Sequence, residues 1–184
     1  MIEETPIMTE FKGSHDGCPV SVPHRHDWKR VMSGYVLGRV ILSPEVINVL
    51  VNLLKSDRPE ERQYAARNLQ HSPAGLSLVP LEKALACEKD SFTAGLLIAA
   101  LGSLGRREVV AAIDSWAKRA EEGLIAQNII QSYLMIWIDT GCTRAESDRF
   151  CERIWQTFRN FAHSHDPLIA EEARRVIDSI VSND

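Results

Sequence analysis

Residues 90–117 read DSFTAGLLIAALGSLGRREVVAAIDSWA, and this stretch decides the fold. It predicts one helix, a tight glycine turn and a second helix. A related segment begins 33 residues earlier, because Asp57, like Asp90, is followed by an alanine pair and a leucine at helical spacing. Self-similarity near this period is typical of helical repeat proteins, in which each unit buries its apolar face by stacking on a neighbour. Arrays of this kind generally bind other macromolecules.

Helix signals extend over most of the rest of the chain. Ser43 followed by Pro44 is a typical helix start, because serine caps the first turn and proline is tolerated at the first helical position. No segment has the alternation of a strand. About eight helices are predicted, over 43–55, 57–70, 77–87, 90–104, 107–120, 124–139, 143–161 and 167–180. We therefore predict an all-α fold in which successive helices form antiparallel pairs.

Capping patterns locate several helix ends. Asp57 with Glu60, and Thr143 with Glu146, have the spacing of a capping box. Gly105 is predicted to end its helix in the left-handed conformation. Segment 124–139 is apolar on so many sides that we expect it to be central rather than at the surface.

The chain divides into two regions on this pattern. Residues 1–42 contain several prolines and glycines and few periodic apolar positions, so we predict an irregular arm with at most a short helix. Residues 43–184 form the predicted helical repeat domain. At 184 residues the chain is long enough to bury a sizeable core.

The charge of the chain lowers the prospect of a nucleic-acid partner. The formal net charge is −4, whereas nucleic-acid binders need a cationic surface. Residues 25–39 are the exception, and nucleic-acid binding through this basic segment is the weaker alternative. Its basic residues are Arg25, Lys29, Arg30 and Arg39. Trp28 lies among them and is the tryptophan that we expect to be exposed.

The N-terminal residues and the cysteines predict a soluble, cytoplasmic protein with no membrane contact. No window approaches the roughly 18 uncharged apolar residues of a spanning helix, and the acidic start is unlike a secretory signal. We expect Cys18, Cys87, Cys142 and Cys151 to be reduced thiols, mostly buried. Nine helical residues rise about 13.5 Å, so a Cys142–Cys151 disulfide is not expected unless the helix between them begins late.

The repeated segments resemble HEAT repeats, in the short variety also seen in phycobiliprotein lyases. AALGSLGRREVVAAIDSWAKRA, at 99–120, carries most of the match, and DRPEERQYAARNLQ, at 57–70, carries the opening pattern. The resemblance covers residues 43–140 well and 141–184 loosely. It implies a short armadillo-type α-α superhelix, or α-solenoid. HEAT-like arrays include scaffolds, inhibitors, chaperones and some enzymes, so the resemblance implies a fold more than an activity.

Two histidine clusters are candidates for a metal or catalytic site. His15, Cys18, His24 and His26 are ligand types that zinc prefers, but their spacing matches no familiar zinc module. His163 and His165 precede Asp166, which we interpret as the cap of the last helix rather than as part of a site. The sequence contains no phosphate loop, nucleophile elbow or metalloprotease motif, so we predict no enzyme and no cofactor.

The predicted function is a non-enzymatic module or adaptor that holds a protein partner, including an inhibitor of the immunity or antitoxin type. In HEAT-like arrays the second helix of each pair lines the concave surface, and this resemblance implies a set of partner-binding residues. They are Glu45, Asn48, Asn52, Glu82, Lys83, Asp114 and Lys118, with Trp28 from the arm. The alternative, implied by the repeat resemblance alone, is a bilin lyase or a lyase chaperone.

Overall fold

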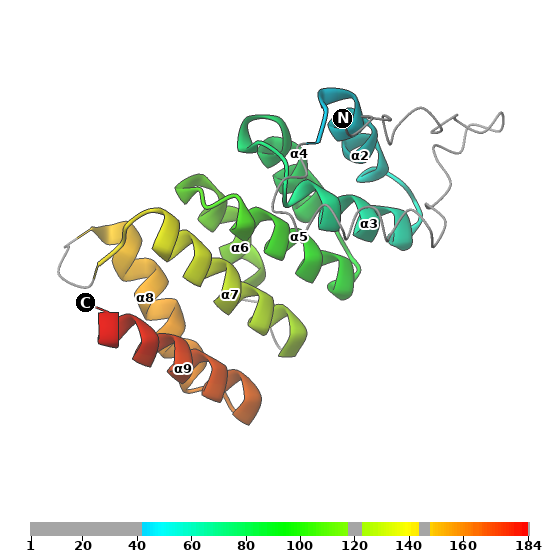
Figure 1. Ribbon diagram of the computed structural model, residues 1–184. Coiled ribbons are helices and arrows are strands. Elements are labelled where there is room, and N and C mark those ends of the chain that lie inside the picture. Colours follow the sequence, from blue (N-terminus) through cyan, green and yellow to red (C-terminus); the bar gives the residue numbers. More distant parts are fainter. Residues whose placement is uncertain (1–41, 118–122, 144–147, 184) are drawn as a thin grey trace, which may run out of the picture.

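The computed structural model describes residues 42–117, 123–143 and 148–183, and this part of the chain is all-helical (Figure 1). It contains eight α-helices, one short 3₁₀ helix and no strand, which confirms the predicted all-α class. The α-helices are α2 (Pro44–Leu53), α3 (Pro59–Leu69), α4 (Ala74–Cys87), α5 (Ser91–Ser103), α6 (Val110–Ala117), α7 (Gly123–Asp139), α8 (Arg149–Ala162) and α9 (Pro167–Asn183), and the 3₁₀ helix η1 is Arg107–Val109.

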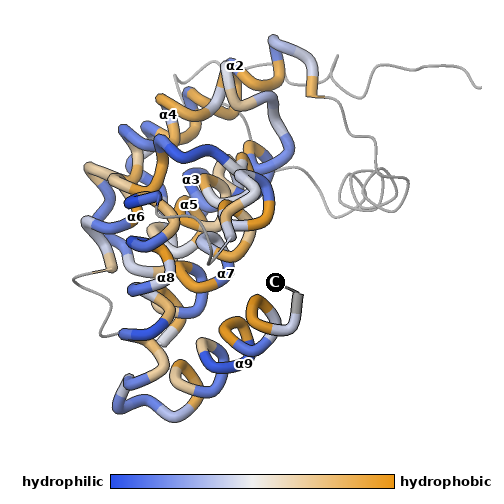
Figure 2. Tube along the Cα trace, turned by 90° about the vertical axis from the view of Figure 1, so that its left-hand side faces the viewer, coloured by the Kyte–Doolittle hydropathy of each residue, from blue (hydrophilic) through white to orange (hydrophobic). Residues whose placement is uncertain are grey.

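The helices form two rows. In the front row α3, α5, α7 and α9 lie side by side in that order, each contacting the next (Figure 1). The back row consists of α2, α4, α6 and α8; Figure 2 shows α4, α6 and α8 in one column beside α3, α5 and α7. Each front-row helix packs on the back-row helix that precedes it in the sequence.

The front-row helices α5 and α7 run parallel and very close together. Near their starts, Gly95 lies against Asn128, and at their ends Gly105 lies against Asp139. These pairs are 33 and 34 residues apart in the sequence, which is the spacing that separates Asp57 from Asp90. Residues that face each other on α5 and α7 are therefore separated in the sequence by about the distance that separates Asp57 from Asp90.

Small residues on α5 make this close approach possible. A Cβ at Gly102 would lie only 2.5 Å from the Cα of Ser132 on α7. The Ser132 hydroxyl donates a hydrogen bond to the carbonyl of Ile98, at 2.9 Å, so the buried polar atom is satisfied. With α3, α4 and α7 around it, α5 buries eight of its thirteen residues.

Both predicted capping boxes are wrong. The N-cap of α3 is Arg58 rather than Asp57, because the Ser56 hydroxyl accepts from the Arg58 backbone N–H at 3.1 Å and donates to Glu61 at 2.6 Å. The N-cap of α8 is Asp148, whose carboxylate accepts from the backbone N–H of Phe150 at 2.9 Å, so this helix begins later than Thr143.

Other helix ends follow the sequence signals. Ser43 caps α2 and Asp90 caps α5, and Gly105 has the predicted positive φ, at +60°. The helix predicted from Ser77 begins earlier, at Ala74. The segment predicted as one helix over 107–120 starts as 3₁₀ and becomes α-helical at Val110.

Cys142 and Cys151 form a disulfide, so the prediction of free thiols at these positions is wrong. Their Cα atoms are 5.6 Å apart, and both residues are buried. Gly141, at φ +66°, turns the chain back at the end of α7, and the N–H of Cys142 bonds to the carbonyl of Trp137. Because α8 begins only at Arg149, the helical rise that would separate the two sulfurs never develops. Cys87 is a free thiol, as predicted, but it is exposed rather than buried, and Cys18 lies outside the described residues.

We expect the double variant Cys142→Ala/Cys151→Ala to lose about 2–3 kcal/mol of unfolding free energy, since it releases a short closed loop in the unfolded chain. Urea unfolding under non-reducing conditions measures the loss. Cys87→Ala serves as the control and should leave the curve unchanged. Equal stability of all three proteins, or free thiols at both positions in peptide mapping, contradicts the assignment.

Over the described ranges, none of the helices has the length and apolar character needed to cross a membrane. This agrees with the absence of a spanning segment predicted from the sequence.

Candidate functional site

The back row carries most of the partner-binding residues predicted from the sequence. Glu45, Asn48 and Asn52 are exposed on one side of α2. On α4, Lys83 is exposed and Glu82 is half-buried. Since α2 contacts α4 and α4 contacts α6, the structure places these residues in one row of helices. Lys118, Trp28 and the basic segment 25–39 lie outside the described residues.

Asp114, the remaining predicted contact residue, is engaged within the protein. Its carboxylate accepts a hydrogen bond from the Tyr133 hydroxyl on α7 and forms an ion pair with Arg153 on α8. Tyr133 is fully buried, and burial raises the pKa of its phenol well above the ordinary value. Asp114 therefore joins α6, α7 and α8, a structural role that the sequence did not indicate.

We expect Asp114→Ala to lower the unfolding free energy by about 2 kcal/mol, because it leaves the buried Tyr133 hydroxyl without an acceptor. Thermal or urea unfolding measures this loss. Ser115→Ala, at the exposed neighbouring position, is the matched control and should stay within about 0.5 kcal/mol of the parent. A stable Asp114→Ala protein that loses its partner would instead support the original prediction of a contact residue.

Only the second of the two histidine clusters lies in the part of the chain that the structure describes. His15, Cys18, His24 and His26 lie outside the described residues. Within the described ranges no group of three or more histidine, cysteine, aspartate or glutamate side chains could hold a metal ion. Near the C-terminus, the Asp166 carboxylate accepts from the N–H of Leu168 at 2.9 Å, so its predicted capping role is confirmed. The ring of His163 bonds to the carbonyl of Arg159, at 2.8 Å.

A polar cluster at the N-terminal ends of α3 and α5 is satisfied internally. Arg62 donates two hydrogen bonds to the carboxylate of Glu88, at 2.8 and 2.9 Å. Glu88 also accepts from the backbone N–H groups of Lys89 and Asp90, at 2.9 and 3.0 Å. Burial alone would raise the pKa of Glu88, but these hydrogen bonds outweigh it and hold the pKa below the ordinary value. The cluster fixes the turn between α4 and α5 and offers no open site.

The front row leaves an apolar strip uncovered. The neighbours of α5 and α7 cover their other sides, so the exposed residues of both helices point away from the back row. We call this strip the α5–α7 face. Its exposed apolar members are Phe92 (41%), Leu124 (45%), Met135 (43%) and Ile138 (62%), and its half-buried apolar members are Leu96, Ala99 and Leu134. The polar residues Gln127, Asn128 and Gln131 lie on the same side of α7, between Leu124 and Met135.

Polar and charged residues border this strip on both sides. On α3, the guanidinium of Arg67 lies over the ring of Phe92, 5.9 Å from its centroid. On the other side, Gln131 of α7 donates a hydrogen bond to Glu172 of α9, which also pairs with Arg175. An apolar centre within a polar border is the usual composition of a protein–protein interface.

The α5–α7 face was missed in the sequence. Because 124–139 is apolar on many sides, it was expected to be central, yet α7 exposes Leu124, Met135 and Ile138. The pattern does contain a signal, since Phe92 and Leu124, like Ser103 and Met135, are 32 residues apart on the exposed sides of successive front-row helices. Exposed residues that recur at this spacing, three of these four being apolar, indicate that the two helices share one exposed side.

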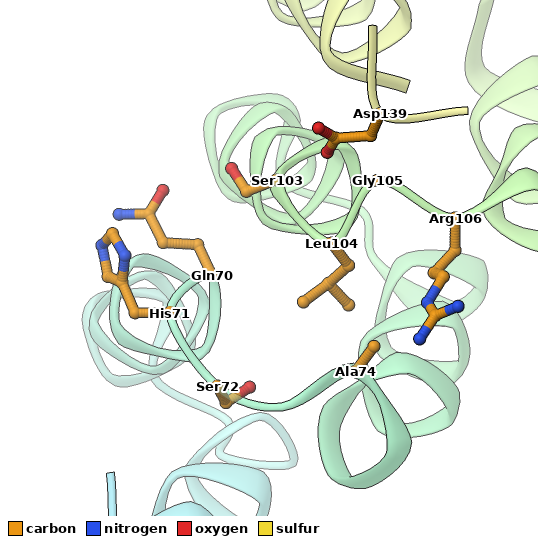
Figure 3. Close-up of a pocket in the computed structure, with 9 residues that line it drawn as sticks. All are labelled: Gln70, His71, Ser72, Ala74, Ser103, Leu104, Gly105, Arg106 and Asp139. Atoms are coloured by element: carbon orange, nitrogen blue, oxygen red, sulfur yellow. The ribbon is translucent and has the colours of Figure 1, made fainter. Parts of the chain in front are cut away.

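A shallow, open pocket of about 510 Å³ lies at the C-terminal ends of the front-row helices α3, α5 and α7 (Figure 3). It is bounded by the C-terminal ends of α3, α5 and α7 and by the start of α4. Figure 3 shows Gln70 and His71 on one side, Arg106 and Ala74 on the other, and Leu104 between them. The lining residues are Gln70, His71, Ser72, Ala74, Ser103, Leu104, Gly105, Arg106 and Asp139.

The polar groups of the pocket differ in charge. Burial lowers the pKa of His71, so its ring is neutral at pH 7. Asp139 supplies a carboxylate and Arg106 a guanidinium, at separate positions on the rim. Asp139 lies directly over Gly105, where any Cβ would collide with its side chain. The glycine thus both permits the left-handed turn and makes room for the carboxylate.

No family model matches this chain, and neither the curated proteins nor the solved structures contain a significant match to it. The chemistry of the described surface therefore carries the functional argument. Two features stand out on that surface, the apolar α5–α7 face and the polar pocket at its end.

Proposed function

We propose that this chain is a short HEAT-like α-solenoid that acts as a non-enzymatic protein-binding module and holds its partner on the α5–α7 face. The uncovered apolar strip on that face carries the proposal. Four large apolar side chains, each at least 41% exposed, lie on two adjacent helices of a tightly packed row. Contiguous apolar patches with polar borders mark interaction sites, whereas single exposed apolar residues need no explanation.

The rigidity of the two helices supports the same function. α5 and α7 touch through glycine and serine and share a hydrogen bond between Ser132 and Ile98, so the face is built on the most closely packed part of the front row. A preorganised surface loses less conformational entropy when it binds. The partner chemistry that fits is an amphipathic protein segment, with apolar side chains toward the strip and polar ones toward Arg67 and Glu172.

The back-row residues predicted from the sequence remain a second candidate for the partner-binding surface. Glu45, Asn48, Asn52 and Lys83 are polar and exposed, and α4 adds Val79 at 53% exposure. Polar residues of this kind are common on any solvated helix, and so they support binding less than the front strip does.

Paired variants test the two faces against each other in the host cell. Met135→Glu/Ile138→Glu places two charges on the front strip, and Val79→Glu/Lys83→Glu changes the back row to a similar extent. A photo-crosslinking amino acid at Gln131 identifies the bound protein by mass spectrometry. We expect one partner whose capture falls at least about tenfold with the front variant and is retained by the back variant, since such charges disrupt an apolar interface.

Unfolding curves of both variants must overlay that of the parent, because all four substitutions are at exposed positions. If only the back variant loses the partner, the binding surface is the one predicted from the sequence. If neither variant changes capture, the proposed binding face is wrong.

A further inference from the structure

The pocket opens at the end of the α5–α7 face. Phe92, Leu96 and Ala99 follow one another along the exposed side of α5, and the next residue on that side, Ser103, lines the pocket. On α7, the exposed Ile138 is followed directly by Asp139, which also lines it. A protein segment lying along the apolar strip therefore reaches the pocket with its next side chains.

Asp139 presents an exposed carboxylate to the pocket at the C-terminal end of α7. Asp139 is the last residue of α7 and lies over Gly105 at the end of α5, with the end of α3 across the pocket. Helix C-termini carry partial negative charge, so a carboxylate among them is repelled and a cation is attracted. Within the described ranges, the Asp139 side chain makes no ion pair and no hydrogen bond. The pocket has its own positive charge at Arg106, but the Asp139 carboxylate remains available to accept hydrogen bonds from a cationic group of a ligand.

The other titratable groups of the pocket limit what fits. His71 is neutral at pH 7, so it adds no positive charge. Arg106 is exposed on the side away from Gln70 and His71, and it disfavours a cation placed close to it. The favourable position for a cation is thus at Asp139, while Arg106 is free to donate to a carbonyl or carboxylate oxygen of the same ligand.

We propose that this pocket receives a lysine or arginine side chain of the protein partner, with its charged group at Asp139 and its main chain toward Arg106. The inference rests on the proposed function, because it assumes a partner segment along the α5–α7 face. It adds a chemical requirement to that function, namely a basic residue just beyond the partner's apolar contacts.

The pocket can be tested without knowing the partner, using the full chain and the peptide Ac-Gly-Arg-Gly-NH2. In ¹H–¹⁵N NMR titrations we expect weak but saturable shifts at Gly105, Arg106 and Asp139. The same peptide with citrulline in place of arginine keeps the shape and removes the charge, and it should shift these signals far less. Asp139→Asn should weaken arginine-peptide binding about tenfold, the typical effect of losing one charge-assisted contact.

Two controls separate binding from folding. Asp178→Asn removes an exposed carboxylate from α9, away from the pocket, and should leave the titration unchanged. Asp139→Asn should unfold at the same temperature as the parent or a higher one, because it removes a negative charge from a helix C-terminus. Equal shifts with both peptides, no shifts with either, or undiminished binding by Asp139→Asn each overturn the proposal.

Partner capture distinguishes failure of the pocket from failure of the proposed function. If Met135→Glu/Ile138→Glu releases the partner while Asp139→Asn holds it with unchanged affinity, the pocket proposal is wrong and the binding face stands. If the arginine peptide binds at Asp139 but the front-row variant keeps its partner, the pocket stands as a cation site and the proposed binding face is wrong.

Discussion

Gly102→Val is expected to lower the free energy of unfolding by about 3 kcal/mol, the upper part of the range for overpacking a core. A Cβ at position 102 would lie 2.5 Å from the Cα of Ser132, which is backbone and has no flexible end to move aside. The side chain must therefore push α5 and α7 apart. That movement also strains the hydrogen bond from Ser132 to Ile98 and opens the strip proposed to hold the partner.

Urea unfolding measures this effect, and Gly75→Ala is its matched control. Gly75 lies in α4, and a Cβ there meets nothing within 4 Å, so alanine should stabilise the protein by about 0.5–1 kcal/mol through the unfolded chain. A Gly102→Val protein as stable as the parent would show that the two helices are not in the close contact described. Loss of stability in both variants would point to a general intolerance of glycine replacement.

The second large effect is expected at Glu88, where alanine should cost about 3 kcal/mol. The carboxylate is 3% exposed and holds Arg62, which is itself 17% exposed, together with two backbone N–H groups. Removing one member of a buried pair leaves the other charge without compensation, which costs more than the pair contributes. Glu171→Ala, at an exposed position of α9, should change stability by less than about 0.5 kcal/mol.

The same pair predicts a pH dependence. The pKa of Glu88 is held below its ordinary value of 4.5 in the folded protein, so the unfolded chain binds the proton first as pH falls. The stabilisation from Glu88 is therefore fully present above about pH 4.5 and is lost as pH falls through its folded pKa. The difference in unfolding free energy between the parent and Glu88→Ala, measured from pH 7 down to pH 3, should become smaller toward the acid end. A constant difference across that range contradicts the assigned role.

The helices were predictable because each is specified by short-range signals. Apolar residues at helical spacing, the caps Ser43 and Asp90, and the glycine at 105 all act within a few residues of the helix that they define. The errors arose where a tertiary contact decides the outcome. The N-cap of α3 is Arg58 rather than Asp57, and Ser56 bonds both to the N–H of Arg58 and to the buried Glu61, a burial that no local sequence pattern indicates.

The disulfide, the role of Asp114 and the α5–α7 face were harder to predict from the sequence, because each depends on contacts between residues of different helices. Whether Cys142 meets Cys151 depends on where α8 begins, and the competing signals at Thr143 and Asp148 differ by five residues. Asp114 was predicted to be a surface residue because its partners, Tyr133 and Arg153, lie far from it in the sequence. The α5–α7 face was hidden because apolar residues that pack and apolar residues that stay exposed look alike in a single helix.

The pattern of helix contacts determines where the protein unfolds locally. The main contacts of each helix are with helices one or two places along the chain, so most stabilising contacts are local in sequence. In such a chain, transient opening starts at the ends and becomes rarer toward the middle. Among the helices that the structure describes, amide hydrogens of α2 and α9 should therefore exchange with solvent before those of α5 and α7. A partner at the α5–α7 face would thus meet the part of the molecule that is least often open.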